Sequence, residues 1–426
     1  MKTQRNAEVE HQVNTLLRAN VPKVLKLARP ANESRARLAM SIGKLIADDL
    51  ESRLAPPPPL RRSSRLASQP HQSSQPTNAR IAKSDCGIHK ATGSLRNKLH
   101  SDKAYAEHTR RLEHRFSTLK AWVNQDYWTN NAARTERQMY KPIQAFHLFV
   151  AQFIRYHLND SAFDNAPNGI IGPPRLVLPY ENVDTKAVGT DDRTRSDIGL
   201  VVCGMDADAA LVEGKPYNSE QFAIIEAKVS ASRAVAAATK NTANRQNEML
   251  DADTTQAFKQ LFMYTRQVYA NQHDRRFMWG ITVCDTRVSA CILSSGGALA
   301  SHEMDVSTAQ GRRQYIQLLV DWSLCDWHQL GFDPSVRWRK DLKYWEIDVP
   351  RLATTASHGS DQQLAASSSS SLTTTTTTYF FDKAYVAADH LFGRHTRCFP
   401  ASLERPEPNK SIEPDVLIKD AWSYVR

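Results

Sequence analysis

Apolar residues recur at helical spacing in three stretches of the chain, residues 135–157, 255–269 and 312–327. Side chains three and four positions apart lie on the same side of an α-helix, so each stretch is predicted to be a helix that packs one face against a core. The broadest apolar stripe consists of Tyr140, Ile143, Phe146, Phe149, Val150 and Ile154. Weaker repeats within residues 11–53 predict one or two amphipathic helices near the N-terminus.

Short runs rich in β-branched and aromatic residues lie between these predicted helices. They cover residues 198–203, 222–229, 277–283 and 288–293. A turn-rich piece separates the first two runs, and Asp285-Thr286 separates the last two, so each pair is predicted to form a hairpin. Helical and strand patterns alternate between about residues 106 and 350, which predicts an α/β body.

Two polar stretches divide the chain. Four prolines at 56–59 are followed by a Ser, Gln and Asn-rich segment with three arginines between 61 and 65, typical of a linker. Residues 357–378 contain the runs SSSSS and TTTTTT, and such tracts have no apolar surface to offset the entropy of ordering. We therefore expect a basic, partly disordered N-terminal arm at 1–104, the α/β body at 105–350, a disordered linker at 351–378 and a further domain starting at 379.

Positive charge is concentrated in the N-terminal part of the chain, which consists of the arm and the first residues of the body. Residues 1–120 contain 23 Lys and Arg against 10 Asp and Glu, whereas the whole chain has a net charge of +10. A basic arm on a near-neutral body suggests contact with nucleic acid or an acidic protein partner. A solvated arm without a specific partner is the alternative.

The predicted compartment is intracellular, either nuclear or cytoplasmic. The six cysteines show no paired spacing, which fits reduced thiols better than a disulfide framework or a zinc knuckle. The N-terminus lacks an apolar signal segment, and no run of 18 apolar residues suggests a membrane span.

The pattern most indicative of chemistry combines two carboxylates with a lysine. Asp197 precedes one predicted strand, and Glu226 and Lys228 lie in the next, on the same face because side chains alternate along a strand. Asp197 and Glu226 could share a hard divalent cation such as Mg²⁺, with Lys228 beside the attacking water. Metal-assisted phosphodiester cleavage needs such a set, and a surface salt bridge is the alternative.

This set resembles the PD-(D/E)xK nuclease superfamily. Gln260 and Tyr264 match the QxxxY pattern of its RecB-like members, and Glu136 stands where that group often carries another acidic residue. The resemblance implies a mixed sheet flanked by helices and supporting roles for these three residues. Ser196 replaces the proline that usually precedes the aspartate.

A second resemblance covers most of residues 105–426, to the fungal-type protein kinase family. The matching segments, in order, are 222–228 (FAIIEAK), 260–264, 272–277, 280–286, 330–334 (LGFDP), 391–396 and 416–422. The last two resemble the phosphate-covering loop and the strand-three lysine of kinases. The resemblance implies that residues 379–426 begin a β-rich kinase N-lobe, in which Gly393 and Lys419 are the equivalents of ATP-binding residues.

The kinase resemblance and the carboxylate set lead to two hypotheses. No HRD-like or DFG-like motif occurs in the sequence, and seven residues follow Lys419, so kinase activity is not expected of this chain alone. In the first hypothesis the chain is a scaffold or a fragment of a longer ATP-dependent kinase. In the second it is a Mg²⁺-dependent nuclease or a nucleic-acid-binding protein.

Overall fold

The structure is a computed structural model of the whole chain. It describes residues 24–55, 102–123, 135–158, 175–181, 196–203, 221–229, 252–294, 297–339, 344–352, 374–382, 385–386, 396–407 and 411–421. Of the predicted site residues, Gly393 lies outside these ranges, as does the arginine cluster at 61–65. Within the described ranges, no helix has both the length and the apolar character needed to cross a membrane.

A mixed sheet of seven described strands forms the centre of the fold. In chain order the strands are β1 (Leu176–Glu181), β2 (Ile198–Cys203), β3 (Gln221–Lys228), β4 (Met278–Cys284), β5 (Arg287–Ser294), β6 (Gly297–Ala300) and β7 (Met304–Asp305). Strands β1 to β6 are neighbours in that order, and β7 pairs with β5. Every pairing is antiparallel except that of β3 with β4, which is parallel. A parallel pair needs a crossover connection, and helix α9 provides it.

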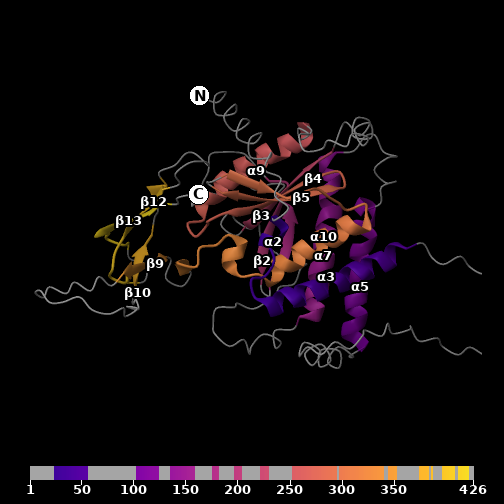
Figure 1. Cartoon of the computed structure of the whole chain (residues 1–426), viewed down its shortest axis with the longest axis horizontal. Helices are drawn as coiled ribbons and strands as arrows, with labels where there is room; N and C mark the ends of the chain where they lie inside the picture. The colour runs from indigo at the N-terminus through magenta and orange to yellow at the C-terminus, as the bar shows by residue number, and fades with distance from the viewer. Residues whose placement is uncertain are drawn as a thin grey trace, which may run out of the picture.

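Helices cover both faces of this sheet (Figure 1). They are α2 (Val24–Leu27), α3 (Glu33–Leu54), α5 (Asp102–Val123), α7 (Glu136–His157), α9 (Ala252–Asn271) and α10 (Ala309–Leu324), followed by the 3₁₀ turn Trp327–Leu330. Helix α9 contacts β3 and β4, whereas α7 packs on β1 and α5, and α10 packs on α3 and β7. The molecule therefore has a mixed α/β architecture, as the alternating pattern predicted.

Two hydrophobic clusters occupy the opposite faces of the sheet. On the α9 face, Ile224 of β3 packs with Leu261 and Phe258 of α9. On the other face, Ile225 and Ala227 of β3 join residues of α3, α5, α7 and α10. The strand reads as a continuous buried run because both of its faces are covered.

The N-terminal helix α3 belongs to the body instead of standing apart in a basic arm. Ile42, Ile46 and Leu50 of α3 are buried in the larger cluster. Arg312 of α10 also forms a two-contact ion pair with Glu51, at 2.6 and 2.7 Å. The predicted arm therefore contains a structural helix, and the apolar spacing within residues 11–53 marks its contact face.

The C-terminal strands form a third hydrophobic cluster beside the body. Strands β8 (Val336–Arg339), β9 (Tyr344–Leu352) and β10 (Thr374–Phe381) make one three-stranded sheet, and β11 (Tyr385–Val386), β12 (Thr396–Ala401) and β13 (Val416–Ala421) make another. Both sheets contribute to one core, which contains Ile347, Tyr379, Phe381 and Phe399. We call these six strands the β-rich unit; β9, β10, β12 and β13 lie at the left of Figure 1.

The threonine tract was predicted to be disordered, but its end is a strand. Residues 374–378 begin β10 and pair antiparallel with β9, where Thr378 lies opposite Asp348. The Thr378 hydroxyl donates a hydrogen bond of 2.7 Å to Asp348. Threonine is β-branched and favours strands once a partner strand is available, which composition alone does not reveal.

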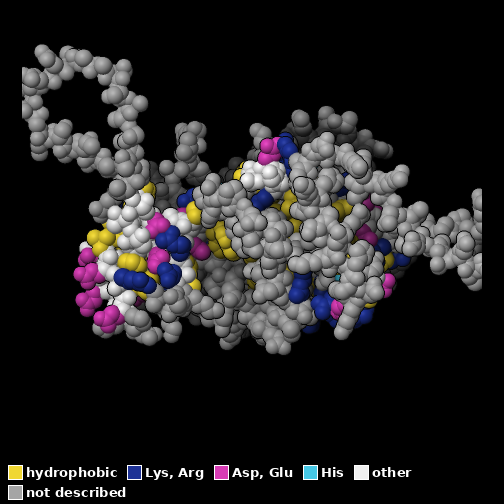
Figure 2. All heavy atoms as spheres, turned by 90° about the horizontal axis from the view of Figure 1, so that it is seen from below, with side chains coloured by type: hydrophobic (Ala, Val, Ile, Leu, Met, Phe, Trp, Pro, Cys, Tyr) yellow, Lys and Arg dark blue, Asp and Glu magenta, His cyan; other side chains and the backbone are white. Residues whose placement is uncertain are grey.

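The exposed face of the β-rich unit carries interleaved charges of both signs, seen at the left of Figure 2. Arg337 of β8 pairs with Asp348 and Glu346 of β9 at 2.5 and 3.4 Å. Arg339 reaches Glu346 at 3.0 Å. Such cross-strand pairs stabilise the register of β8 on β9 without making a surface of a single charge.

Candidate functional site

Strand β3 presents Glu226 and Lys228 on one face of the sheet. They share the strand parity of Ile224, which packs under α9, whereas Ala227 faces the opposite core. The side chains are buried, with Glu226 1% exposed and Lys228 9% exposed. Lys228 Nζ lies 2.8 Å from Glu226 Oε1. The contact between the Glu226 carboxyl and the Lys228 ammonium is therefore enclosed, and it is not the surface salt bridge that the sequence left open.

The register of β2 on β3 brings Asp197 beside Glu226. Ile198 lies opposite Ile225, so the residue that precedes β2 comes level with Glu226. Asp197 Oδ2 accepts a hydrogen bond of 2.8 Å from the backbone N–H of Ala227. Its other oxygen, Oδ1, accepts a hydrogen bond from the hydroxyl of Tyr140. Both contacts fix the orientation of the Asp197 carboxylate.

Glu136 reaches the same cluster from the start of α7. Thr135 caps this helix, and a capping box with Gln138 fixes where the helix begins. Glu136 Oε2 lies 3.2 Å from Lys228 Nζ, and its side chain is 43% exposed. Lys228 therefore lies between a buried carboxylate and one at the rim of the site.

Helix α9 brings Tyr264 within range of the charges of the carboxylates, with Gln260 one turn before it. Tyr264 is buried, and its pKa is raised by burial and then by the charges of Glu226, Asp197 and Glu136. Gln260 Oε1 is buried and has no hydrogen-bond partner in the described part of the chain. Of the six residues predicted for this site, Glu136, Glu226 and Lys228 are in direct contact, whereas Asp197 and Tyr264 lie within range of their charges. Gln260 lies one helical turn before Tyr264.

Burial and crowded negative charge raise the carboxyl pKa values in the cluster. Burial, followed by the charge of Asp197, raises the pKa of Glu226 to about 8. Burial also raises the pKa of Asp197, although its hydrogen bonds from Tyr140 and Ala227 oppose the shift. Burial alone would lower the pKa of Lys228, but Glu226 and Glu136 raise it above its ordinary value. Lys228 therefore stays protonated, whereas the neighbouring carboxyl groups of Asp197 and Glu226 ionise less readily than usual.

Asp197 and Glu226 are suited to hold a hard cation with the help of water. Among the described residues, no three His, Cys, Asp or Glu side chains are close enough to enclose a metal ion by themselves. Glu226 Oε2 is buried and has no hydrogen-bond donor within those residues. Mg²⁺ commonly uses one or two carboxylates and keeps several waters, so this donor set fits Mg²⁺ better than zinc.

Tyr140 is a site residue that the sequence did not single out. It was assigned to the apolar stripe of α7, yet its hydroxyl contacts Asp197. Its position four residues after Glu136 puts both side chains on one helical face. The spacing Glu136-x-x-x-Tyr140 parallels Gln260-x-x-x-Tyr264, and that parallel was the available signal.

Lys419 is distant in sequence from the cluster. It lies in β13, where it pairs with Cys398 of β12. Its side chain is exposed. The structure thus puts Lys419 on a strand, as expected, while its predicted partner Gly393 lies outside the described residues.

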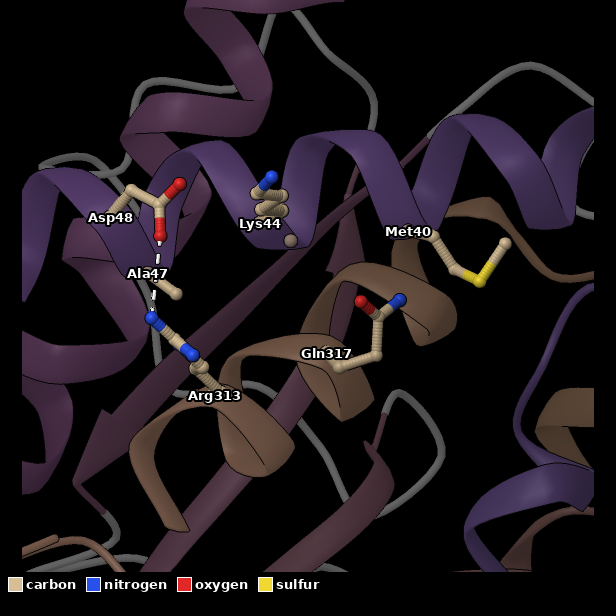
Figure 3. A pocket seen from close by; sticks show the side chains of 7 residues that line it. Met40, Lys44, Ala47, Asp48, Arg313 and Gln317 are labelled. Atoms are coloured by element: carbon tan, nitrogen blue, oxygen red, sulfur yellow. Dashed lines mark ion pairs between the residues drawn. The ribbon is translucent and has the colours of Figure 1, made fainter. Parts of the chain in front are cut away.

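A separate cavity of about 240 Å³ lies between α3 and α10 (Figure 3). Its lining includes Met40, Lys44, Asp48, Arg313 and Gln317, with an ion pair of 3.6 Å between Asp48 and Arg313. It shares no residue with the carboxylate–lysine cluster. Helices α3 and α10 approach each other closely at Gly43. A Cβ atom at this position would collide with the side-chain amide of Gln317 on α10.

Comparison with known proteins identifies one family. The family model described as fungal protein kinase matches residues 226–426, a span that begins at Glu226 and includes the end of β3 and strands β4 to β13. No curated protein matches the chain, and no solved structure matches it. The similarity of the carboxylate–lysine cluster to PD-(D/E)xK nucleases stays a prediction.

Proposed function

We propose that this chain, whose residues 226–426 match the family model described as fungal protein kinase, has a phosphate chemistry of its own in its α/β body. The proposed activity is Mg²⁺-dependent binding and cleavage of nucleic-acid phosphodiesters at Asp197, Glu226 and Lys228. The observation that carries the proposal is the enclosed pair Glu226–Lys228, with Asp197 fixed beside it.

The protonation state of Glu226 supports this proposal. An acid buried beside another acid is costly to ionise, and its pKa of about 8 expresses that cost. A divalent cation would favour the ionised form of both carboxylates. Perturbed acids with defined charged partners are found preferentially at functional sites.

Each residue has a distinct role in the proposed reaction. When bound, Mg²⁺ supplies Lewis-acid polarisation of a phosphoryl oxygen and a more acidic water. Asp197 and Glu226 hold it, and the hydroxyl of Tyr140 keeps Asp197 oriented. Lys228 stays protonated and stabilises the negative charge that develops on the phosphoryl group. Glu136 holds the Lys228 ammonium from the open side, at 3.2 Å.

Cleavage of labelled single- and double-stranded DNA and RNA, with Mg²⁺ or Mn²⁺, tests the proposal. We expect metal-dependent cleavage that drops about 100-fold or more in Glu226→Gln, which weakens a metal ligand, and in Lys228→Met, which removes the charge that stabilises the transition state. Lys141→Met on α7 is the matched control, because Lys141 is exposed, outside the cluster and outside the basic residues 1–120. A folded wild-type chain that cuts none of these substrates with either metal would refute the cleavage step.

Nucleic acid as the partner is supported by the excess of 23 Lys and Arg over 10 Asp and Glu in residues 1–120. Contacts with phosphates release counterions, so affinity should fall steeply between 50 and 200 mM salt, by about 10³ if six phosphates are contacted. Binding measured by fluorescence anisotropy across this salt range checks the expectation. Affinity that is independent of salt argues against this partner.

A second candidate function is ATP binding by the β-rich unit, supported by the family match over β8 to β13. Protein kinases use ATP with Mg²⁺, and a strand lysine pairs with the α- and β-phosphates. Lys419 is the candidate for this role, and the body would then be a scaffold. Binding of a fluorescent ATP analogue should weaken in Lys419→Met but not in Arg337→Gln. Equal binding by both variants would exclude the role of Lys419.

A further inference from the structure

Residues 272–277, which we call the junction loop, connect α9 to β4 and contact both the body and the β-rich unit. Two of its side chains are almost fully buried, with Gln272 2% exposed and Arg275 1% exposed. Arg275 stacks over the ring of Phe332, its guanidinium carbon 3.5 Å from the ring centroid. Arg276 forms an ion pair of 2.9 Å with Asp333. These contacts fix the conformation of the junction loop. A displacement of the loop would therefore also displace the elements that it contacts.

On the body side, the junction loop holds the first residue of β3. Gln272 Nε2 and Arg275 Nη2 both donate to the backbone carbonyl of Gln221, each at 2.8 Å. Arg275 Nε also donates to Gln272 Oε1, so the two donors are held as a pair. Gln221 begins the strand that carries Glu226 and Lys228. The two hydrogen bonds to the Gln221 carbonyl fix the start of β3. The position of Glu226 and Lys228 in the fold therefore depends on them.

On the other side, the junction loop receives an arginine from the β-rich unit. Arg397 of β12 is 2% exposed, and its Nη1 donates to the carbonyl of His273 and, at 3.3 Å, to the carbonyl of Arg275. The His273 ring lies 5.3 Å from Trp345 and 6.5 Å from Phe399, centroid to centroid. Arg397 thus binds the backbone of the residue whose side chain holds Gln221.

From these contacts we infer that Arg397 is a positioning residue that couples the β-rich unit to the carboxylate–lysine cluster through the junction loop. The path is continuous, from Arg397 to the carbonyls of the loop, then to Gln221 and along β3 to Glu226. The inference concerns regulation of the site, and its metal-affinity part rests on the proposed function.

The same strand links Arg397 to the candidate ATP lysine. Arg397 precedes Cys398, which pairs with Lys419 across β12 and β13. A nucleotide bound at this sheet would bias how Arg397 meets the junction loop. Because coupling between two binding sites is reciprocal, the nucleotide would change metal affinity by the factor by which metal changes nucleotide affinity.

The test uses the full chain with Arg397→Gln, Arg397→Lys and the control Arg337→Gln, whose residue lies on the same unit but contacts β9 instead of the loop. Two readouts are compared, amide hydrogen exchange in β3 and equilibrium Mn²⁺ affinity. For Arg397→Gln we expect about 10-fold faster exchange at Gln221–Ala223 and about 10-fold weaker Mn²⁺ binding. Arg397→Lys keeps the charge but loses the fork of donors, so its effects should be intermediate.

Exchange in β9 and β10 reports whether the β-rich unit remains folded in each variant. If it unfolds in Arg397→Gln, Arg397→Lys becomes the deciding variant. Unchanged exchange at the start of β3 in a folded Arg397 variant overturns the coupling. If wild type binds no Mn²⁺ but exchange responds as expected, the coupling stands and the metal site fails. Mn²⁺ binding without any response of β3 supports the metal site and overturns the coupling.

Discussion

Glu226 makes the properties of the cluster depend on pH and on cations. It lies in a fully buried strand, contacts Lys228 and has a pKa of about 8, against 4.5 for an ordinary glutamate. In the absence of metal, the folded chain therefore binds a proton at Glu226 that the unfolded chain releases. The environment of Glu226 and the contact that orients Asp197 each lead to a prediction at the scale of single residues.

The first prediction concerns how the free energy of unfolding changes with pH. Between about pH 4.5 and 8 the folded state binds more protons at Glu226 than the unfolded state does, so this residue's contribution to stability falls as the pH rises. Glu226→Gln cannot ionise and should lose less stability over that range, by on the order of a few kcal/mol at pH 8. Urea unfolding in EDTA at pH 5 and pH 8 measures the difference. Parallel losses in both proteins would mean that Glu226 ionises freely.

The second concerns Tyr140. Its hydroxyl hydrogen bond lowers the pKa of Asp197, which burial raises. Tyr140→Phe should therefore leave Asp197 harder to ionise and worse oriented, weakening Mn²⁺ binding by about 10-fold. Tyr156→Phe is the control, since that ring stacks on His108 at 3.8 Å, at the other end of α7. Calorimetric titration of both variants provides the check, and equal affinities would remove Tyr140 from the site.

At the scale of elements, the sequence predicted helices where the apolar spacing is strong and strands where β-branched runs are bounded by turns. Helices α7, α9 and α10 and the hairpins β2–β3 and β4–β5 agree with those predictions. Strand β1 was not predicted; it contains Pro179, which weakens a strand pattern but is tolerated because β1 is an edge strand. The parallel pairing of β3 with β4 joins segments on either side of α9. The local sequence patterns do not predict which strands pair across such a helix.

The candidate site was more predictable than the packing around it. The residue types of Asp197, Glu226 and Lys228 suggested the cluster, and strand alternation placed the last two together. The contribution of Tyr140 and the junction loop's hold on Gln221 depend on tertiary contacts between distant segments. Such contacts are set by how helices pack on the sheet, which single-sequence periodicity does not specify.

Helix α3 yields a prediction at this scale. Ile46 is fully buried in the body core, whereas Lys44 on the same helix is exposed. Ile46→Ala should lower the free energy of unfolding by about 2–5 kcal/mol through lost burial and the remaining cavity. Lys44→Ala should change it by no more than about 0.5 kcal/mol. Chemical denaturation of the two variants measures the change in the free energy of unfolding. No change in Ile46→Ala would mean that α3 does not contribute to the stability of the body.

At the scale of the whole molecule, the chain combines a region that matches the family model of fungal protein kinases with a buried carboxylate–lysine cluster, and the match begins inside that cluster, at Glu226. The body and the β-rich unit meet at the junction loop, through Arg397 and His273. The family-matched region thus includes the end of β3, with Glu226 and Lys228, and the strand that carries Lys419. Both candidate phosphate chemistries are parts of one folded arrangement.

Equilibrium Mn²⁺ binding to the full chain, followed by electron paramagnetic resonance with Mg²⁺ as competitor, tests the proposed metal chemistry of the cluster at its first step. We expect one Mn²⁺ site per chain that Mg²⁺ displaces, and a loss of affinity of about 10- to 100-fold or more in Asp197→Asn and in Glu226→Gln. A folded wild-type chain that binds no Mn²⁺, or binding that survives both substitutions unchanged, would contradict the proposed site.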